Sequence, residues 1–263
     1  MIRDPSAPPS RSRNPRVVPG STPEMADMAD RGSPPAPEPP AFGSADRSLS
    51  AFVWYRIVQA FFSTVLASWF GLRASGRAKI PDRGPLLLVS NHLSHLDVLV
   101  LGILLARPLN YMARSTLFFF PLGQFIRSVG SFPINREGMG AEGFKETLRR
   151  LRAGGIVTLF PEGTRTSDGE LAELKAGIAR LVARSKVPIV PAAIAGSFEA
   201  WPRSRSFPTP HPLRVHFGEP ISTEQIASLA PDDLTTLIRD RLLECQAIAR
   251  RGIGRDLGRR LGG

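Results

Sequence analysis

From residue 76 onward, short apolar runs alternate with segments whose apolar residues recur at helical spacing. The apolar runs predict strands at residues 85–90, 109–112, 131–134, 156–160, 187–194 and 213–217. The intervening segments predict helices at residues 94–105, 116–128, 141–152 and 173–184, followed by a last helical stretch at about 223–250. This alternation favours an α/β fold with a mainly parallel central sheet flanked by helices. In such folds, functional sites lie at the carboxyl ends of the strands.

The most apolar and aromatic stretch, residues 51–72, precedes this alternation. Its uncharged part, residues 57–72, spans about 24 Å as a helix and is shorter than the roughly 20 residues of a comfortable bilayer span. Arg56, Gln59 and Ser63 fall near one face, while large apolar residues spread around the rest of the helix. The aromatic content and flanking arginines favour a helix lying in the membrane interface. A helix buried in the domain core is the alternative.

Composition separates residues 1–47 from the rest of the chain. They hold 11 of the 25 prolines and little apolar bulk, so they cannot offset the entropy of ordering and are predicted to form a disordered tail. The tail has six arginines and six acidic residues, so the formal net charge of +11 belongs to residues 48–263. We therefore divide the chain into this tail, an apolar membrane-associated helical segment at 48–75, a main domain at 76–248 and a basic C-terminal tail at 249–263.

A strongly basic domain has three usual partners, which are nucleic acid, an anionic membrane surface and a phosphorylated substrate. Nucleic-acid binding predicts basic residues interleaved with stacking aromatics. Here the aromatics cluster in residues 51–72, and the C-terminal arginines fit anionic lipid headgroups better. The one cysteine, Cys245, excludes a disulfide within the chain and suggests a reducing compartment. We expect an anionic membrane surface and no nucleic acid.

An imidazole and a carboxylate, His92 and Asp97, lie five positions apart directly after the first predicted strand. A neutral imidazole becomes a useful general base when a buried carboxylate holds its far nitrogen. We predict this pairing, with His95 as the second choice of base and Ser94 as the helix N-cap. A capped, surface-polar turn is the alternative for the segment that begins at Asn91.

A metal centre needs three or more convergent protein ligands. His92, His95 and Asp97 are ligand types at close spacing, but only His211 and His216 remain as histidines elsewhere. No metal site is predicted.

The turn after the strand at 156–160 combines groups that suit an anion. Gly163 permits close backbone approach, Thr164 offers a hydroxyl, and Arg165 has a planar fork that matches a phosphate. A charged turn with an internal pair between Glu162 and Arg165 is the alternative. Arg136, just beyond the strand at 131–134, is either a phosphate clamp or a solvated arginine.

Taken in order, these motifs resemble the glycerolipid acyltransferase family typified by 1-acylglycerol-3-phosphate acyltransferase. The matching motifs are at residues 91–97, 130–136, 160–165 and 187–191, and a Leu-Phe-x-x-Pro-x-x-Gly pattern at 117–123 follows a basic residue, Arg114. The resemblance covers about residues 50–225. Position 95 is commonly a large aromatic residue in this family and is His here, and Pro133 and Asn135 are unusual for it.

The resemblance implies transfer of a fatty acyl group from acyl-CoA or acyl-carrier protein to the free hydroxyl of lysophosphatidate, giving phosphatidate in phospholipid biosynthesis. It implies His92 as the general base oriented by Asp97, without an acyl-enzyme, a metal or a cofactor. It also implies a set of residues for the acceptor phosphate, which are Arg136, Glu162, Gly163, Thr164 and Arg165, with Asn91, Arg114 and Lys175 as further candidates.

The same resemblance implies a membrane lipid as acceptor. Residues 48–75 would dock the acyltransferase domain at 76–248 on the cytoplasmic face of the inner or plasma membrane. Two alternatives remain open. One is an acyltransferase for another lyso-lipid, such as lyso-ornithine lipid or a different lysophospholipid, and the other is an inactive lipid-binding scaffold.

Overall fold

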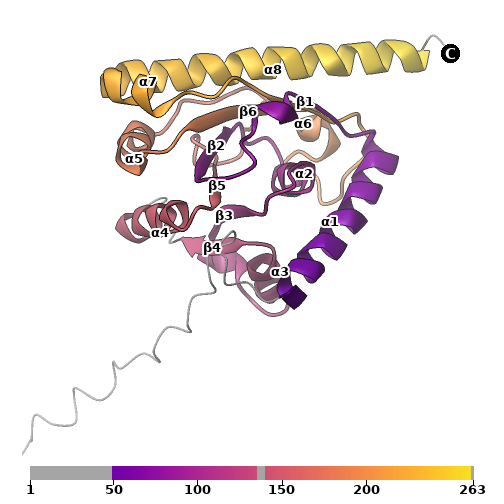
Figure 1. Cartoon of the computed structure of the whole chain (residues 1–263). Helices are drawn as coiled ribbons and strands as arrows, with labels where there is room; N and C mark the ends of the chain where they lie inside the picture. Colours follow the sequence, from indigo (N-terminus) through magenta and orange to yellow (C-terminus); the bar gives the residue numbers. More distant parts are fainter. Residues whose placement is uncertain (1–48, 135–139, 262–263) are drawn as a thin grey trace, which may run out of the picture. The chain divides into compact units, whose positions relative to one another are not determined.

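The computed structural model describes residues 49–134 and 140–261 (Figure 1). The tail predicted at residues 1–47 and the predicted phosphate ligand Arg136 lie outside the described residues. Seven strands of the described part form one sheet in the order β1-β7-β6-β2-β5-β3-β4. The strands are β1 Arg73–Ser75, β2 Leu86–Ser90, β3 Leu109–Arg114, β4 Ser131–Ile134, β5 Ile156–Leu159, β6 Ile189–Ala195 and β7 Arg214–Phe217. Neighbouring strands are parallel except β6 and β7, which confirms the predicted, mainly parallel sheet.

Helices cover both faces of this sheet (Figure 1). The α-helices are α1 Leu49–Phe70, α2 Leu96–Leu104, α3 Leu122–Ser128, α4 Ala141–Arg152, α5 Gly177–Ser185, α6 Ser197–Ala200, α7 Thr223–Ser228 and α8 Pro231–Leu261. Successive residues of β2 point to opposite faces. Leu86 and Leu88 pack in a core that includes residues of α1 and α2, whereas Leu87 and Val89 pack in a core with α4, α5, α7 and α8. Because β2 is covered on both faces, its sequence is a continuous apolar run.

Helix α1 buries Gln59 in the domain together with Tyr55, Leu66 and Phe70, while other large apolar residues of the helix face away from it. The side chain of Gln59 is buried and donates to the carbonyl oxygens of Gly102 (3.0 Å) and Leu105 (2.7 Å) at the end of α2, where helical carbonyls lack intrahelical partners. In contrast, Ile57 and Phe61 are 57% and 63% exposed. The helix is long and apolar enough to cross a membrane, with a mean hydropathy of 1.3 and 17% of its most apolar window buried.

Two predicted helices begin later than the pattern indicated. The segment at 116–128 contains a short 3₁₀ turn, η3 Ser115–Leu117, and then α3, which starts after Pro121. A proline lacks the backbone N–H and disfavours helical geometry in the residue before it. The segment predicted as a helix at 173–184 becomes helical only at Gly177. The residues just before Gly177 are not helical. They follow Ala172, whose backbone N–H donates to the Glu162 carboxylate of the candidate site.

The carboxyl-terminal part of the chain differs most from the prediction. The stretch expected at 223–250 is two helices, and Pro231 opens the second, a position that proline favours. Helix α8 continues through the boundary drawn at residue 248, and Asp256 pairs there with Arg214 of β7. Strand β1, which lies within the segment assigned to 48–75, was not predicted. Its three residues carry no apolar run, and they become a strand by pairing with β7.

Candidate active site

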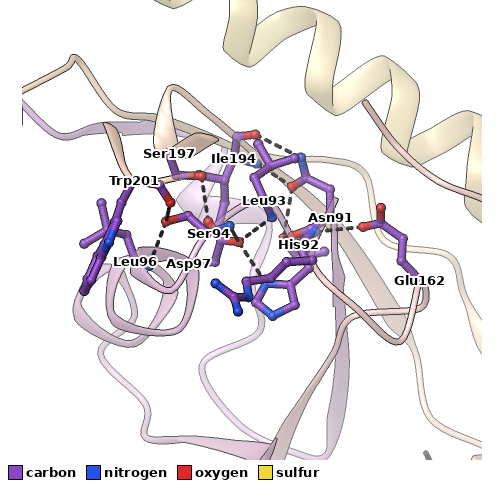
Figure 2. Close-up of polar contacts among 12 residues, drawn as sticks. Asn91, His92, Leu93, Ser94, Leu96, Asp97, Glu162, Ile194, Ser197 and Trp201 are labelled. Carbon is purple, nitrogen blue, oxygen red and sulfur yellow. Dashed lines mark hydrogen bonds and ion pairs between the residues drawn. The ribbon is translucent and has the colours of Figure 1, made fainter. Parts of the chain in front are cut away.

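The carboxyl ends of three neighbouring strands, β6, β2 and β5, bring the site residues together. Asn91 follows β2 directly and is buried. Its Nδ2 donates to the carbonyl oxygen of Ile194 (2.9 Å), and its Oδ1 accepts from the Ile194 N–H (2.8 Å), as Figure 2 shows. The Asn91 side chain therefore fastens the end of β2 to β6 and supports the turn that follows.

His92 and Asp97 are in direct contact. The His92 Nδ1 lies 2.9 Å from Asp97 Oδ2, and the His92 side chain is 19% exposed while that of Asp97 is fully buried. The backbone N–H groups of Leu93 (2.6 Å) and Ser94 (2.8 Å) donate to the same oxygen (Figure 2). An ionised carboxylate only accepts hydrogen bonds, so Nδ1 of a neutral His92 carries the proton. The lone pair then lies on Nε2, the nitrogen that a general base uses.

Ser197 is a member of the site that the sequence reasoning missed. It is buried at the start of α6, immediately beyond β6, and its hydroxyl donates to Asp97 Oδ1 over 2.7 Å. Both oxygens of the Asp97 carboxylate thus accept hydrogen bonds, one of them from a residue 100 positions away. The signal available in the sequence was a hydroxyl residue three positions beyond the strand predicted at 187–194, close to the strand end as His92 is.

The ring plane of His92 is set by Phe160, which follows β5. The two rings stack with their centroids 4.0 Å apart and an angle of 18° between their planes. Together with the bond to Asp97, this contact holds the imidazole in one orientation.

Glu162 faces the protein interior. Its Oε1 accepts from the backbone N–H of His92 (2.7 Å), its Oε2 accepts from the N–H of Ala172 (2.9 Å), and it is only 2% exposed. Burial raises the pKa of this carboxyl, while the hydrogen bonds from Ala172 and His92 oppose the rise. With both oxygens directed to backbone donors, Glu162 positions the His92 backbone. The structure does not direct it to an acceptor phosphate, the role that the resemblance implied.

The other residues of the turn lie closer to the surface. Gly163 has a φ of +71° and donates its N–H to the Phe160 oxygen (3.0 Å), a conformation that glycine adopts without strain. A Cβ at this position would lie 3.3 Å from Cε of Lys175, so the lysine chain passes over the glycine. Thr164 is exposed and Arg165 half-buried. The turn is joined to the segment after β2 by the Thr166 N–H, which donates to the His92 oxygen (2.9 Å).

His95 lies on the exposed side of the same turn, and its ring centroid is 5.3 Å from that of Trp201. Partial burial lowers the pKa of His95, and the neighbouring Arg165 lowers it further. Ser94 does not cap α2 in the predicted way, because the helix begins at Leu96 with His95 at the N-cap position. The Ser94 hydroxyl instead donates to the Trp201 oxygen (2.9 Å) and accepts from the Leu96 N–H (3.2 Å).

The two other histidines and the candidate Arg114 belong to other strands and loops of the described structure. His216 pairs with the hydroxyl of Ser75 (2.8 Å) across β7 and β1, and His211 Nδ1 lies 3.1 Å from the Pro212 oxygen. Arg114 ends β3. Within residues 49–134 and 140–261, no group of three or more His, Cys, Asp or Glu side chains is placed to hold a metal ion.

The chain is similar to known acyltransferases in sequence and in fold. The family model described as Acyltransferase matches residues 71–195. The 1-acyl-sn-glycerol-3-phosphate acyltransferase of Bacillus subtilis is 26% identical over 201 residues, which cover 73% of this chain and 96% of that protein. The protein of the same name from Limnanthes alba is 30% identical over 158 residues, which cover 59% of this chain and 56% of that protein.

The crystal structure of the 1-acyl-sn-glycerophosphate acyltransferase PlsC of Thermotoga maritima superposes with a TM-score of 0.66 at 20% identity. The match covers 80% of this chain and 83% of that one. At this identity the likeness establishes the fold. The family model, the sequence relatives and the fold agree, and the chain is an acyltransferase-like enzyme.

Proposed function

We propose that this enzyme transfers a fatty acyl group from acyl-CoA or acyl-carrier protein to the free hydroxyl of lysophosphatidate and so forms phosphatidate. Relatives named 1-acyl-sn-glycerol-3-phosphate acyltransferases support this acceptor. The observation that carries the proposal is the His92 imidazole, whose Nδ1 is held at 2.9 Å by the buried Asp97 and whose Nε2 remains available for a proton.

The acceptor hydroxyl oxygen attacks the thioester carbonyl carbon while its proton passes to His92 Nε2. The buried carboxylate of Asp97 stabilises the imidazolium that forms. When the tetrahedral intermediate collapses, the carbon–sulfur bond breaks and the imidazolium returns the proton to the leaving thiolate. The products are the ester and a free thiol, and His92 is again neutral. The thioester is a co-substrate, and the proposal needs no acyl-enzyme.

The acceptor phosphate is proposed to bind at the turn beside His92. Arg165 supplies a planar, permanently charged guanidinium, and Lys175 supplies a point charge over Gly163. The exposed Thr164 and Gly163 offer a hydroxyl and close backbone approach. The resemblance adds two arginines to this set: Arg114, the last residue of β3, and Arg136, which follows the adjacent strand β4 in the chain.

The lipid substrate is proposed to reach the site from a membrane on which α1 lies, at the cytoplasmic face of the inner or plasma membrane. In water, exposed aromatic residues on one helix face opposite a buried Gln59 are unfavourable. In the membrane interface the same arrangement is favourable, because Trp and Phe partition into the headgroup region. The exposed side chains Trp54, Phe61 and Trp69 fit this placement. The positive charge of residues 48–263 fits an anionic surface.

The test measures phosphatidate formed from lysophosphatidate with acyl-CoA or acyl-carrier protein in mixed micelles. His92→Ala is expected to lower kcat by about a thousandfold, the order of magnitude for loss of a general base. His216→Gln is the matched control, since this histidine pairs with Ser75 at the sheet edge and glutamine preserves a polar partner. Circular dichroism verifies that both variants fold. Undiminished turnover by His92→Ala would refute the proposed base, and a wild-type enzyme active only on another lyso-lipid would refute the proposed acceptor.

A further inference from the structure

Three chain segments meet on the exposed side of His92, and backbone oxygens join them. The Thr166 N–H donates to the His92 oxygen (2.9 Å), and the Ser94 hydroxyl donates to the Trp201 oxygen (2.9 Å), as Figure 2 shows for the second bond. The Arg203 guanidinium donates to the Arg165 oxygen over 3.4 Å. The turn after β2, the turn after β5 and the loop after α6 are therefore held as one surface beside the catalytic imidazole.

His95 lies within this surface. Its exposed imidazole is placed against the Trp201 ring at a centroid distance of 5.3 Å. Four ionisable groups act on it, of which Arg165, Arg203 and His92 disfavour its protonated form and Asp97 favours it. Asp97, which is buried and accepts four hydrogen bonds, is the one group of these four that favours the protonated imidazole. Without a bound anion, the surface presents the guanidinium groups of Arg165 and Arg203 and the neutral imidazole of His95.

We propose that His95 and Arg203 extend the phosphate site around Arg165 and that His95 makes it selective for a phosphomonoester. The inference rests on the proposed function, because the phosphomonoester is taken to be that of the acceptor lipid. His95 packs its ring against Trp201 and carries a nitrogen that can be protonated.

The physical basis is charge compensation. A phosphomonoester dianion beside His95 offsets the positive charges of Arg165 and Arg203 and favours protonation of the imidazole. The bound state then takes up a proton and gains a charge-assisted hydrogen bond. Affinity for the dianion is therefore expected to rise as pH falls from 8 toward about 6.5. Below about pH 6 the phosphate itself takes up its second proton and loses charge.

The kinetic experiment compares the full-length wild-type enzyme with His95→Phe, which retains a ring against Trp201. At pH 6.5 the KM for lysophosphatidate is expected to rise roughly tenfold with kcat nearly unchanged, the size of one lost charge-assisted hydrogen bond. The KM for a monoacylglycerol, which lacks the phosphate, is expected to stay the same. Arg203→Gln is expected to raise the KM for lysophosphatidate at every pH. Arg184→Gln, an exposed charge on α5, is the control for loss of one positive charge.

The binding experiment needs no turnover. Calorimetry with a short-chain, soluble lysophosphatidate in buffers of different ionisation enthalpy measures the protons taken up on binding. Wild type is expected to take up more protons than His95→Phe at pH 7.5. The inference would be overturned, even if phosphatidate is formed, by two results together. The ratio of the KM for lysophosphatidate to that for the monoacylglycerol would be the same in wild type and His95→Phe, and so would the proton uptake. If wild type binds with the expected proton uptake but forms no phosphatidate, the inference stands and the proposed function fails.

Discussion

Glu162→Gln separates the two roles open to this carboxylate. In wild type, the N–H groups of His92 and Ala172 donate to the two Glu162 carboxylate oxygens over 2.7 and 2.9 Å. If Glu162 positions the His92 backbone, the substitution places an amide NH₂ group, which cannot accept, against one of these two N–H groups. A buried N–H without an acceptor costs about 1–3 kcal/mol, and the remaining bond loses its charged acceptor. We expect the free energy of unfolding to fall by about 2–3 kcal/mol. In a domain of this size the Tm should fall by about 5–10 °C.

The assay combines thermal unfolding with steady-state kinetics. In the positioning role, kcat falls and the KM for lysophosphatidate changes little, because no phosphate contact is lost. Glu170→Gln is the control, since its carboxylate is 62% exposed and pairs with Arg250 at the surface, where an ion pair contributes at most about 1 kcal/mol. An unchanged Tm together with a changed KM would refute the positioning role and return Glu162 to the phosphate site.

The pH dependence of stability gives a second check on Glu162. Burial raises its pKa in the folded protein. Between the ordinary carboxyl pKa and this raised value, the folded state binds more protons than the unfolded state, so stability falls as pH rises. The stabilising contribution of Glu162 is therefore complete below the ordinary pKa and is lost as pH rises through the raised pKa. Since glutamine does not titrate, the stability difference between wild type and Glu162→Gln should shrink over this window, and a growing difference would contradict it.

Two further predictions concern the Asp97 carboxylate and helix α1. Ser197→Ala removes the donor to Asp97 Oδ1. The free energy of unfolding should fall by about 1–2 kcal/mol. The acid limb of the kcat/KM pH profile should move to higher pH, because a carboxylate with fewer hydrogen-bond donors favours the His92 imidazolium more strongly. Ser197→Thr should restore the profile, and an unshifted limb in Ser197→Ala would show that the serine is merely structural. Phe61→Glu, at a position 63% exposed on α1, should weaken flotation with anionic vesicles roughly tenfold, whereas Leu243→Glu on α8 should leave it unchanged; equal flotation of both would exclude α1 as the docking surface.

Much of the fold was predictable because the signals for it are local. The apolar run of β2 and the period of α4 are properties of adjacent residues, and α4 has the predicted bounds, Ala141–Arg152. Strand β1 and the position of α8 depend on distant partners. Three residues without an apolar run form β1 only because β7 lies beside them.

The candidate site divides in the same way. The contact between His92 and Asp97 was predictable, because a strand followed at once by a helix leaves a short turn in which residues five apart can meet. The hydroxyl of Ser197 and the inward direction of Glu162 were not, since both depend on β6 and β5 flanking β2 in the sheet.

By itself the sequence determined the α/β class, the central strands and the pairing of His92 with Asp97, because backbone geometry limits what neighbours along the chain can do. It also placed Arg56, Gln59 and Ser63 on one face of α1. Only the tertiary structure decided that Gln59 on this face is buried against α2 while Phe61 is exposed. The reason is physical: a helical pattern separates two faces, but the neighbour that satisfies the polar one, here the free carbonyls at the end of α2, is supplied by the fold.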